Sequence, residues 1–482
     1  MSLSGALSNA MSGISANARA ASLVSDNIAN ALTPGYGRRE LVTQSDNVAT
    51  HGGVQVSGVI RHSDPVLLAE RRLADAQAEG QAVLAGNAQK LEMLVGSPLD
   101  ETSLTGLLDA FDASLISAAA DPSATLRLTQ VSRSALAISG RLNDLTNSVQ
   151  SSRRDAEASI AAQVSRLNGA LERIADLNTR ISQMENAGQD NSVYVDQRQL
   201  EIDSVGEMLS IRVVARDRGE VAIFSTGGAV LLEGSPAQFA FTRANEIAPH
   251  MTQANGLLSG LLMNGEPVAT GPDGRTGGGT LAAAFQIRDQ ETVGFQAKLD
   301  GLALDLAQRL GAGGPDSTLI PGDPGIFTDN GAAVTAADLT GLAGRLTLNA
   351  AVAPGAQTVW KLRDGLGAST PGTVGDAGLL NGYRDALSTV TAPTATALGG
   401  ITQDAFGHFS DLVTGIADAR ISAERDLAFA RGQQLALQEQ ELAEGVDTDH
   451  EMQLLLKIEQ NYAANAQVIR VLDDLMQQLL QI

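Results

Sequence analysis

The 482-residue sequence contains no cysteine. This absence excludes disulfide bonds, a thiolate metal site and a cysteine nucleophile. Small exported domains often depend on disulfides, so a large chain without cysteine suits an export route that carries an unfolded, uncrosslinked polypeptide. Aromatic residues are also scarce, at 3% with a single tryptophan, so the core must consist mainly of Ala, Leu, Val and Ile. Such a composition favours helices that pack closely together.

Positively charged residues are also few: the chain has 33 Lys and Arg and 55 Asp and Glu, which gives a net charge of -22. Nucleic-acid binding and attachment to an anionic membrane both draw on clustered Lys and Arg, so neither is expected. No run of about 18 apolar residues occurs, so no membrane insertion is predicted. The first residues lack the basic segment and the continuous apolar stretch of a cleavable secretion signal.

Motifs that carry chemistry are nearly absent. The five histidines are scattered, and no HExxH, P-loop or GxSxG pattern is present. The acidic residues of 447–451 alternate like the start of a calcium loop, but Met452 stands where that loop needs glycine, so a helix cap is the preferred interpretation. The Asp-Gln-Arg at 196–198 and the Arg-Asp at 288–289 are interpreted as ion pairs between helices. No catalytic residue, metal site or cofactor is predicted, and the chain is not expected to be an enzyme.

Glycine divides the chain, since residues 1–200 hold 14 of the 50 glycines and residues 206–415 hold 34. The sequence therefore predicts a mainly α fold with a β-rich insertion: terminal helices in a coiled-coil-like inner domain, a rod of long helices and a Gly-rich, β-containing outer region. The expected domains are a terminal α-helical assembly domain (1–62 and 446–482), a long-helix rod domain (63–312 and 395–445) with β-hairpins around 206–284, and an inserted β-containing outer domain (313–394).

Long helices are predicted between the two ends. Asp64-Pro65 and Asp121-Pro122 each have the form of an N-cap followed by proline at the first helical position. The helix after the second pair continues to about Gly188, and its roughly 60 residues would span about 90 Å. The remaining predictions are two helices, at 285–310 and 401–444, and two hairpins, at 210–225 and 345–362.

Both chain ends carry an apolar seam with alternating spacings of four and three residues. The N-terminal seam is Leu3, Leu7, Ala10, Ile14, Asn17, Ala21, Val24 and Ile28. The C-terminal seam is Leu455, Ile458, Tyr462, Asn465, Ile469, Leu472, Met476 and Leu479. This 3.5-residue repeat is typical of coiled coils, and a single polar seam residue fixes register. Ordinary amphipathic helices on one globular core are the alternative. A helix with one narrow apolar stripe is marginal alone, so the ends are expected to become ordered on assembly.

The segment SDNIANALTPGY (25–36) resembles the N-terminal signature of the flagellar axial proteins, the family of rod, hook and hook-associated proteins. The expected helix-stop motif consists of Asn27, Asn30, Thr33, Pro34, Gly35 and Tyr36. Segment 454–480 is similar to the C-terminal helix of that family, with matches at Gln460, Tyr462, Asn465, Ala466, Val468 and Ile469. The chain departs from the family pattern at Leu32, where Asn is usual, and in the diluted acidic run at 447–453.

Segments 192–209 and 277–291 resemble the hook-associated branch of this family. The resemblance implies a structural adaptor that polymerises as a ring at the hook tip and joins hook to filament. It also implies extracellular localisation at the hook–filament junction after export without a cleaved signal peptide. The implied partners are further copies of the chain, the hook protein, a second junction protein or flagellin on the filament side, and an export chaperone on the C-terminal helix. The alternatives are a hook or rod subunit, and an exported protein with a binding or enzymatic central domain.

Overall fold

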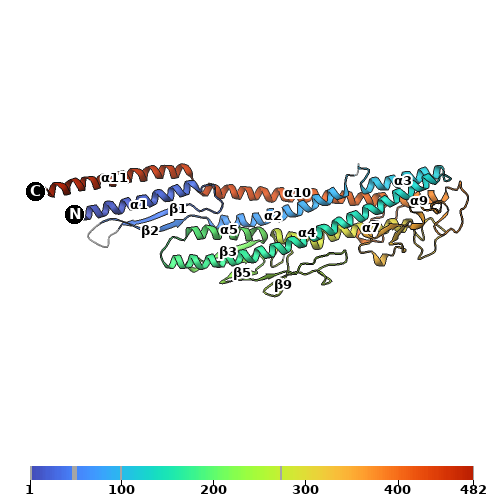
Figure 1. Ribbon diagram of the computed structural model, residues 1–482, viewed down its shortest axis with the longest axis horizontal. Helices are drawn as coiled ribbons and strands as arrows, with labels where there is room; N and C mark the ends of the chain where they lie inside the picture. Colours follow the sequence, from blue (N-terminus) through green and yellow to red (C-terminus); the bar gives the residue numbers. More distant parts are fainter. Residues whose placement is uncertain (1–2, 46–51, 98–99, 272–273, 481–482) are drawn as a thin grey trace.

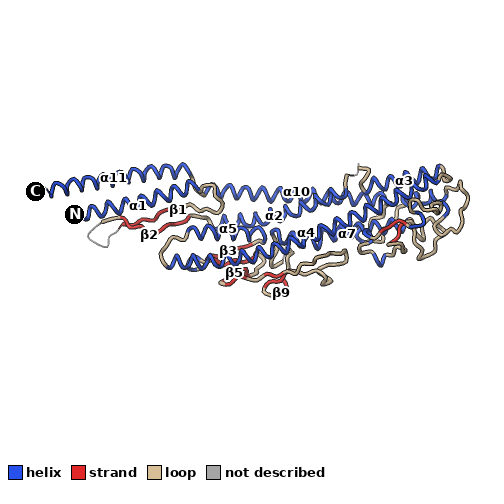
Figure 2. Tube along the Cα trace, viewed as in Figure 1, coloured by secondary structure: helices blue, strands red, loops and turns tan. Residues whose placement is uncertain are grey.

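The computed structural model describes residues 3–45, 52–97, 100–271 and 274–480. The chain forms an elongated rod whose long helices follow its long axis, and both chain ends lie at the same end of the rod (Figure 1). The terminal domain at this end consists of α1 (Leu3–Ala29), α11 (Thr448–Leu480), β1 (Arg39–Ser45) and β2 (Val54–Arg61). Figure 2 shows that helices dominate the molecule and that strands are confined to small sheets. The predicted mainly α fold with β insertions is therefore confirmed.

The rod is built from long helices: α2 (Pro65–Val95), α3 (Leu104–Ala120), α4 (Thr125–Asn186), α5 (Ser192–Met208), α6 (Gly279–Gln286), α7 (Thr292–Arg309) and α10 (Ala405–Glu444). As predicted, Asp64 caps α2 by accepting from the N–H groups of Val66 and Leu67. The predicted cap at Asp121 is wrong, because α3 runs up to this residue and α4 starts only at Thr125. At 62 residues, α4 spans about 93 Å if straight.

The strands outside the terminal domain form three small antiparallel sheets. They are β3 (Ile211–Ala215), β4 (Val221–Ser225), β5 (Val230–Glu233) and β6 (Ser235–Pro236); β7 (Phe239–Ala240), β8 (Leu261–Met263) and β9 (Glu266–Val268); and β10 (Phe327–Asp329) and β11 (Leu346–Leu348). The predicted hairpin at 210–225 is confirmed, with Ile211 opposite Ser225. The hairpin predicted at 345–362 is wrong. There β11 pairs with β10 instead, and the chain continues into the short helix α8 (Lys361–Asp364), followed by α9 (Gly378–Ser388).

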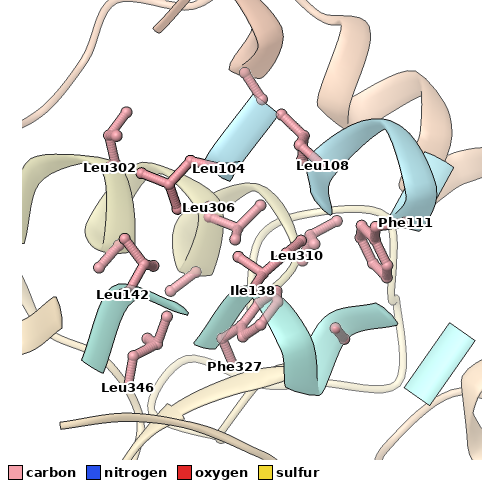
Figure 3. Close-up of a cluster of buried hydrophobic side chains, with 14 of the residues drawn as sticks. Leu104, Leu108, Phe111, Ile138, Leu142, Leu302, Leu306, Leu310, Phe327 and Leu346 are labelled. Carbon is pink, nitrogen blue, oxygen red and sulfur yellow. The ribbon is translucent and has the colours of Figure 1, made fainter. Parts of the chain in front are cut away.

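One apolar core fills the end of the rod distant from the chain termini; we call it the distal core. Figure 3 shows its centre, where side chains from α3, α4, α7 and the β10–β11 region converge: Leu104, Leu108, Phe111, Ile138, Leu142, Leu302, Leu306, Leu310, Phe327 and Leu346. Residues of segment 313–394 share this core with the rod helices. The three-domain division remains a prediction, because the shared core gives the structure no boundary by which to judge it.

A second apolar core lies between α4, α5, α6 and the sheets of 211–268. On α4 the distal core ends at Val149 and the second core begins at Ile160. Between them lies a buried polar cluster, in which Arg288 donates to Glu157 at 2.7 Å and both side chains are fully buried. Arg153 donates to the carbonyl oxygens of Arg288 and Ala248, at 3.2 and 3.1 Å. The ion pair predicted for Arg288 thus joins α4 to the π-helical turn Ile287–Glu291.

Candidate assembly site at the chain ends

The two terminal helices pack against each other within one chain. Gly13 of α1 faces Asn465 of α11 so closely that a Cβ at Gly13 would lie 2.9 Å from Asn465 Nδ2. A small residue therefore permits this close helix approach, and the polar residue of the C-terminal seam lies opposite it. The sequence predicts that the chain ends become ordered on assembly, and in the structure α1 and α11 already pack against each other within one chain, at the same end of the rod.

The buried face of α1 is rotated relative to the predicted seam. Ala10 and Val24 are buried, whereas the other seam residues are only half-buried: Leu3, Leu7, Ile14, Asn17, Ala21 and Ile28. Gly5, Gly13, Ala16 and Asn27 complete the buried face. Small side chains at these positions bring the backbone closer to α11 than the larger seam residues would allow, which explains the rotation.

On α11 the predicted seam divides into two groups. Ile458 is buried and four further residues are half-buried: Leu455, Asn465, Ile469 and Leu472. Tyr462 and Met476 are 46% and 48% exposed, so the described part of the chain covers only about half of each residue. The side chain of Leu479 lies outside the described residues. Between α1, α11 and the β1–β2 hairpin remains a cavity of about 480 Å³, lined in part by Asn17, Val24 and Ile458.

Asn27 connects the two ends of the chain through a complete set of hydrogen bonds. Its amide nitrogen donates to Glu451 Oε2 at 3.1 Å and to the Arg39 carbonyl at 2.9 Å. Its amide oxygen accepts from the Tyr36 hydroxyl at 2.8 Å and from the Arg39 N–H at 3.0 Å. The other oxygen of the fully buried Glu451 accepts from Arg38 Nε at 2.7 Å. Because a buried polar group is costly unless it is paired, this network fixes one register between α1 and α11.

The predicted helix-stop motif ends α1 with a turn. Thr33 N–H donates to the Asn30 carbonyl and Tyr36 N–H donates to the Thr33 carbonyl, at 2.9 and 3.2 Å. Gly35 has a φ of 78°, a conformation that glycine adopts without steric cost. Pro34 is exposed. Burial raises the pKa of Tyr36, although the Arg39 guanidinium, 4.9 Å from its ring centroid, opposes this shift.

Asp196 of α5 attaches this turn to the rod. Its carboxylate accepts from Arg61 Nε at 2.7 Å, from Arg39 at 2.5 Å and from the Gly37 N–H at 3.3 Å. Arg61 also donates to the Gly35 carbonyl at 3.0 Å. The ion pairs predicted for Asp196 are present, but their partners lie on the β1–β2 hairpin rather than on a helix. In the same motif, Arg198 donates to Asn178 and to the Gly219 carbonyl, and burial lowers its pKa to about 10.

The beginning of α11 has the predicted cap. Asp447 Oδ1 accepts from the N–H groups of Asp449 and His450, at 2.9 and 3.1 Å. Glu451 is engaged by Asn27 and Arg38, so the acidic run serves the helix start and the terminal network rather than a calcium loop. Among the described residues no cluster of His, Asp and Glu has the arrangement of a metal site, and no helix is long and apolar enough to cross a bilayer.

Sequence reasoning missed two parts of this site. It did not predict the β1–β2 hairpin, and it assigned no role to Arg38, Arg39 and Arg61 in holding the terminal domain. Three arginines within 38–61 of so acidic a chain were a signal that carboxylate partners exist. Those partners, Asp196 and Glu451, lie far away in the sequence.

Three family profiles match the chain. The profile described as the flagellar hook-associated protein FlgK helical domain matches residues 88–313. The flagella basal body rod protein profile matches residues 7–36, which include most of α1 and its helix-stop motif. The profile of the C-terminal region of the flagellar basal body rod proteins FlgEFG matches residues 443–482, which include α11. The two rod-protein matches thus coincide with the two helices that pack together.

Curated relatives and a solved structure carry related names. Flagellar hook-associated protein 1 of Salmonella typhimurium is 29% identical over 250 residues, covering 49% of this chain and 44% of that protein. Its counterpart in Escherichia coli is 27% identical over 319 residues, covering 64% of this chain and 56% of that protein. The matched part therefore spans about half the length of these relatives. The flagellar hook junction protein FlgK from Burkholderia pseudomallei matches with a TM-score of 0.43 and 20% identity, over 54% of this chain and 46% of that one.

The order of the matches along the chain agrees with the architecture. A rod-protein segment stands at each end, and the FlgK helical domain lies between them and covers α3, α4, α5 and the second core. This chain is therefore similar to the flagellar hook-associated proteins in its central part and to the flagellar rod proteins at both ends.

Proposed function

We propose that this chain is a structural adaptor of the bacterial flagellum, which polymerises as a ring at the hook tip and joins hook to filament. The observation that carries the proposal is the combination in one chain of rod-protein ends, packed as α1 and α11, with the FlgK helical domain. The proposed location is outside the cell, at the hook–filament junction, and no catalytic role is assigned.

The surface of α11 supports an assembly role. Beyond its contact with α1, this helix exposes several large apolar side chains: Met452, Leu456, Val468, Val471 and Leu475. Gathered exposed apolar side chains mark interaction sites more often than a plain solvent face. The cavity beside Asn17 and Ile458 shows that the terminal domain is incompletely filled by its own residues. Both features suit a domain whose packing is completed by neighbouring subunits.

The proposed partners follow from a position between hook and filament. They are further copies of this chain, the hook protein on one side, and a second junction protein or flagellin on the other. An export chaperone that covers the C-terminal helix before assembly is the remaining proposed partner. A hook or rod subunit is the competing interpretation, since the terminal matches are shared with rod proteins, but the match at 88–313 favours the junction role.

The test uses cells that lack this chain. We expect them to assemble hooks without filaments and to shed flagellin into the medium, and the full-length gene should restore filaments. The Leu472→Asp variant places a charge on the half-buried face of α11 and should abolish filaments. Leu126→Asp, the same change at a residue of α4 that is 76% exposed, is the matched control. Normal filaments on cells that lack the chain would refute the proposal.

A further inference from the structure

The terminal domain is joined to the rod by two short segments of chain, which we call the connectors. One connector is residues 62–64, between β2 and α2, and the other is residues 445–447, between α10 and α11. The connectors lie side by side, because His62 and Gly445 line the same cavity of about 60 Å³. Figure 1 shows α1 and α11 extending beyond the point where α10 ends. The covalent link between the two parts is therefore narrow.

The terminal domain takes part in neither apolar core. Among the described residues, both the distal core and the second core consist of rod and insertion side chains, with none from α1, α11, β1 or β2. One apolar contact is made by Leu200 of α5, which is 48% exposed; a Cβ at Gly35 would lie 2.9 Å from its Cδ2. Domains whose interface is not large and hydrophobic are expected to move relative to each other. A specific polar contact is therefore needed to keep the terminal domain at one angle.

The carboxylate of Asp196 on α5 supplies such a contact. Its Oδ1 accepts from Arg61 Nε at 2.7 Å and its Oδ2 accepts from Arg39 at 2.5 Å. The N–H group of Gly37 also donates to Oδ1, at 3.3 Å. The Asp196 side chain is 15% exposed and each arginine side chain is 12% exposed, so solvent screens these ion pairs only in part. Hydrogen bonds between ionised groups are the stronger kind. One side chain of the rod thus holds both strands of the hairpin.

The register of the hairpin explains why a carboxylate is needed there. Arg39 of β1 and Arg61 of β2 are directly opposite each other. Like charges at opposite positions of an antiparallel pair are destabilising. Asp196 bridges the two guanidinium groups and offsets their repulsion. The opposed arginines cost the hairpin stability by themselves, and the contact with α5 accounts for their presence.

The pairing of α1 with α11 uses other contacts. Asn27 donates to Glu451 and accepts from the N–H group of Arg39, and Arg38 donates to Glu451. None of these hydrogen bonds includes Asp196. Loss of the Asp196 contact should therefore leave α1 and α11 paired. Segments of a few residues at the ends of helices and strands are where hinge motions occur, so the connectors are the expected axis of such a motion.

We propose that Asp196 is a latch that fixes the angle between the terminal domain and the rod. With the latch closed, α1 and α11 follow the long axis of the rod (Figure 1). With the latch open, the terminal domain turns as one body about the two connectors, and its direction is set by whatever packs against it. The latch is a property of the single chain and does not depend on the proposed ring.

The absence of cysteine from the chain permits a direct test with spin labels. The full chain carries labels at Arg19→Cys on α1 and Asp176→Cys on α4, both exposed positions, and double electron–electron resonance measures their distance distribution. We expect a narrow distribution, and at least double its width in Asp196→Asn, which directs a neutral amide at two guanidinium groups. The matched control is Glu201→Gln on the same helix. It breaks an ion pair with Arg173 inside the rod and should leave the width unchanged.

A second label pair distinguishes turning from unfolding. Arg19→Cys with Glu459→Cys places both labels in the terminal domain, at exposed positions of α1 and α11, and Asp196→Asn should leave their distance distribution unchanged. Broadening of this pair as well would mean that the terminal domain unfolds, which overturns the latch. An unchanged first pair, or a first pair that is equally broad with Asp196 in place, overturns it too. Loss of the rod helices in Asp196→Asn, measured by circular dichroism, has the same meaning, because a latch holds neither apolar core together.

Discussion

The two ends of the rod are held together by different means. The distal core is apolar, and its central side chains from α3, α4 and α7 are fully buried. The terminal domain joins α1 to α11 through small residues and one buried polar network around Asn27, and it leaves apolar side chains of α11 exposed. The distal end is therefore held by a filled apolar core, whereas the terminal end is specified in register but incompletely buried. This difference suits a subunit whose distal part is fully packed and whose terminal helices still expose apolar surface to a partner.

The largest expected effect on the free energy of unfolding comes from a cavity in the distal core. Phe111 is fully buried and its ring meets that of Phe327 edge-on, with centroids 6.4 Å apart. Phe111→Ala should lower the free energy of unfolding by about 3–5 kcal/mol, because it leaves a cavity in close-packed surroundings. Urea denaturation followed by circular dichroism measures this change. Ile116→Ala, at a 46% exposed position of the same helix, should cost far less. Equal losses would contradict the assignment of the stability of this end to its buried apolar core.

A smaller, local effect is expected in the terminal domain. Asn27→Ala leaves the Tyr36 hydroxyl, the Arg39 backbone and Glu451 without their partner, at a cost of about 1–3 kcal/mol. Hydrogen exchange should therefore become faster in α1 and at the start of α11, while α3 and the distal half of α4 keep their protection. Asn30→Ala removes only bonds within its own turn and serves as the control. Faster exchange throughout the rod would mean that the two ends unfold together.

The smallest effect is a difference in pH dependence between the two ends. Burial raises the pKa of Asp300, which contacts the distal core, although the N–H groups of Ala343 and Gly341 oppose this shift. The folded chain binds this proton more tightly than the unfolded chain. The stabilisation from protonated Asp300 is thus complete below the ordinary value of 3.8 and is lost as pH rises through the raised pKa. The hydrogen bond with His62 lowers the pKa of Glu40 in β1, and Arg38 adds to this, so its contribution is present above 4.5 and is lost as pH falls.

Urea denaturation across this acidic range compares each wild-type residue with its neutral variant. The stability of wild type relative to Asp300→Asn should fall as pH rises, and that of wild type relative to Glu40→Gln should fall as pH drops. The second effect is the weaker, since Glu40 is largely exposed to solvent. The same slope for both pairs would show that the two carboxyl groups do not differ in the way their surroundings indicate.

Elements with local signals were predictable from the sequence. The start of α2 at Asp64-Pro65, the length of α4 and the β3–β4 hairpin all depend on neighbouring residues and their spacing. The end of α10 at Glu444 and the Asp447 cap belong to the same group. Caps, glycines and apolar periodicity act over a few residues, so one sequence suffices to recognise them.

Features that depend on distant partners were not predictable. β11 has the composition of a hairpin strand, but its partner β10 precedes it, and the sequence that follows it is helical in the distal core. The motif around Asn27 was recognised, whereas its partner Glu451 lies 424 residues away and is one acidic residue among many. The rotation of the α1 face towards Gly13 arises from contact with Asn465, which no pattern within α1 contains.

The charged cluster of Arg153, Glu157 and Arg288 interrupts the apolar interior halfway along a helix that itself continues without a break. Buried apolar side chains unfold cooperatively when they are in contact. On α4, the side chains up to Val149 belong to one core and those from Ile160 onwards belong to another. Heating should therefore unfold the rod as two cooperative units that share α4. The helix should lose its structure first in one half, up to its centre, while the more stable half remains folded.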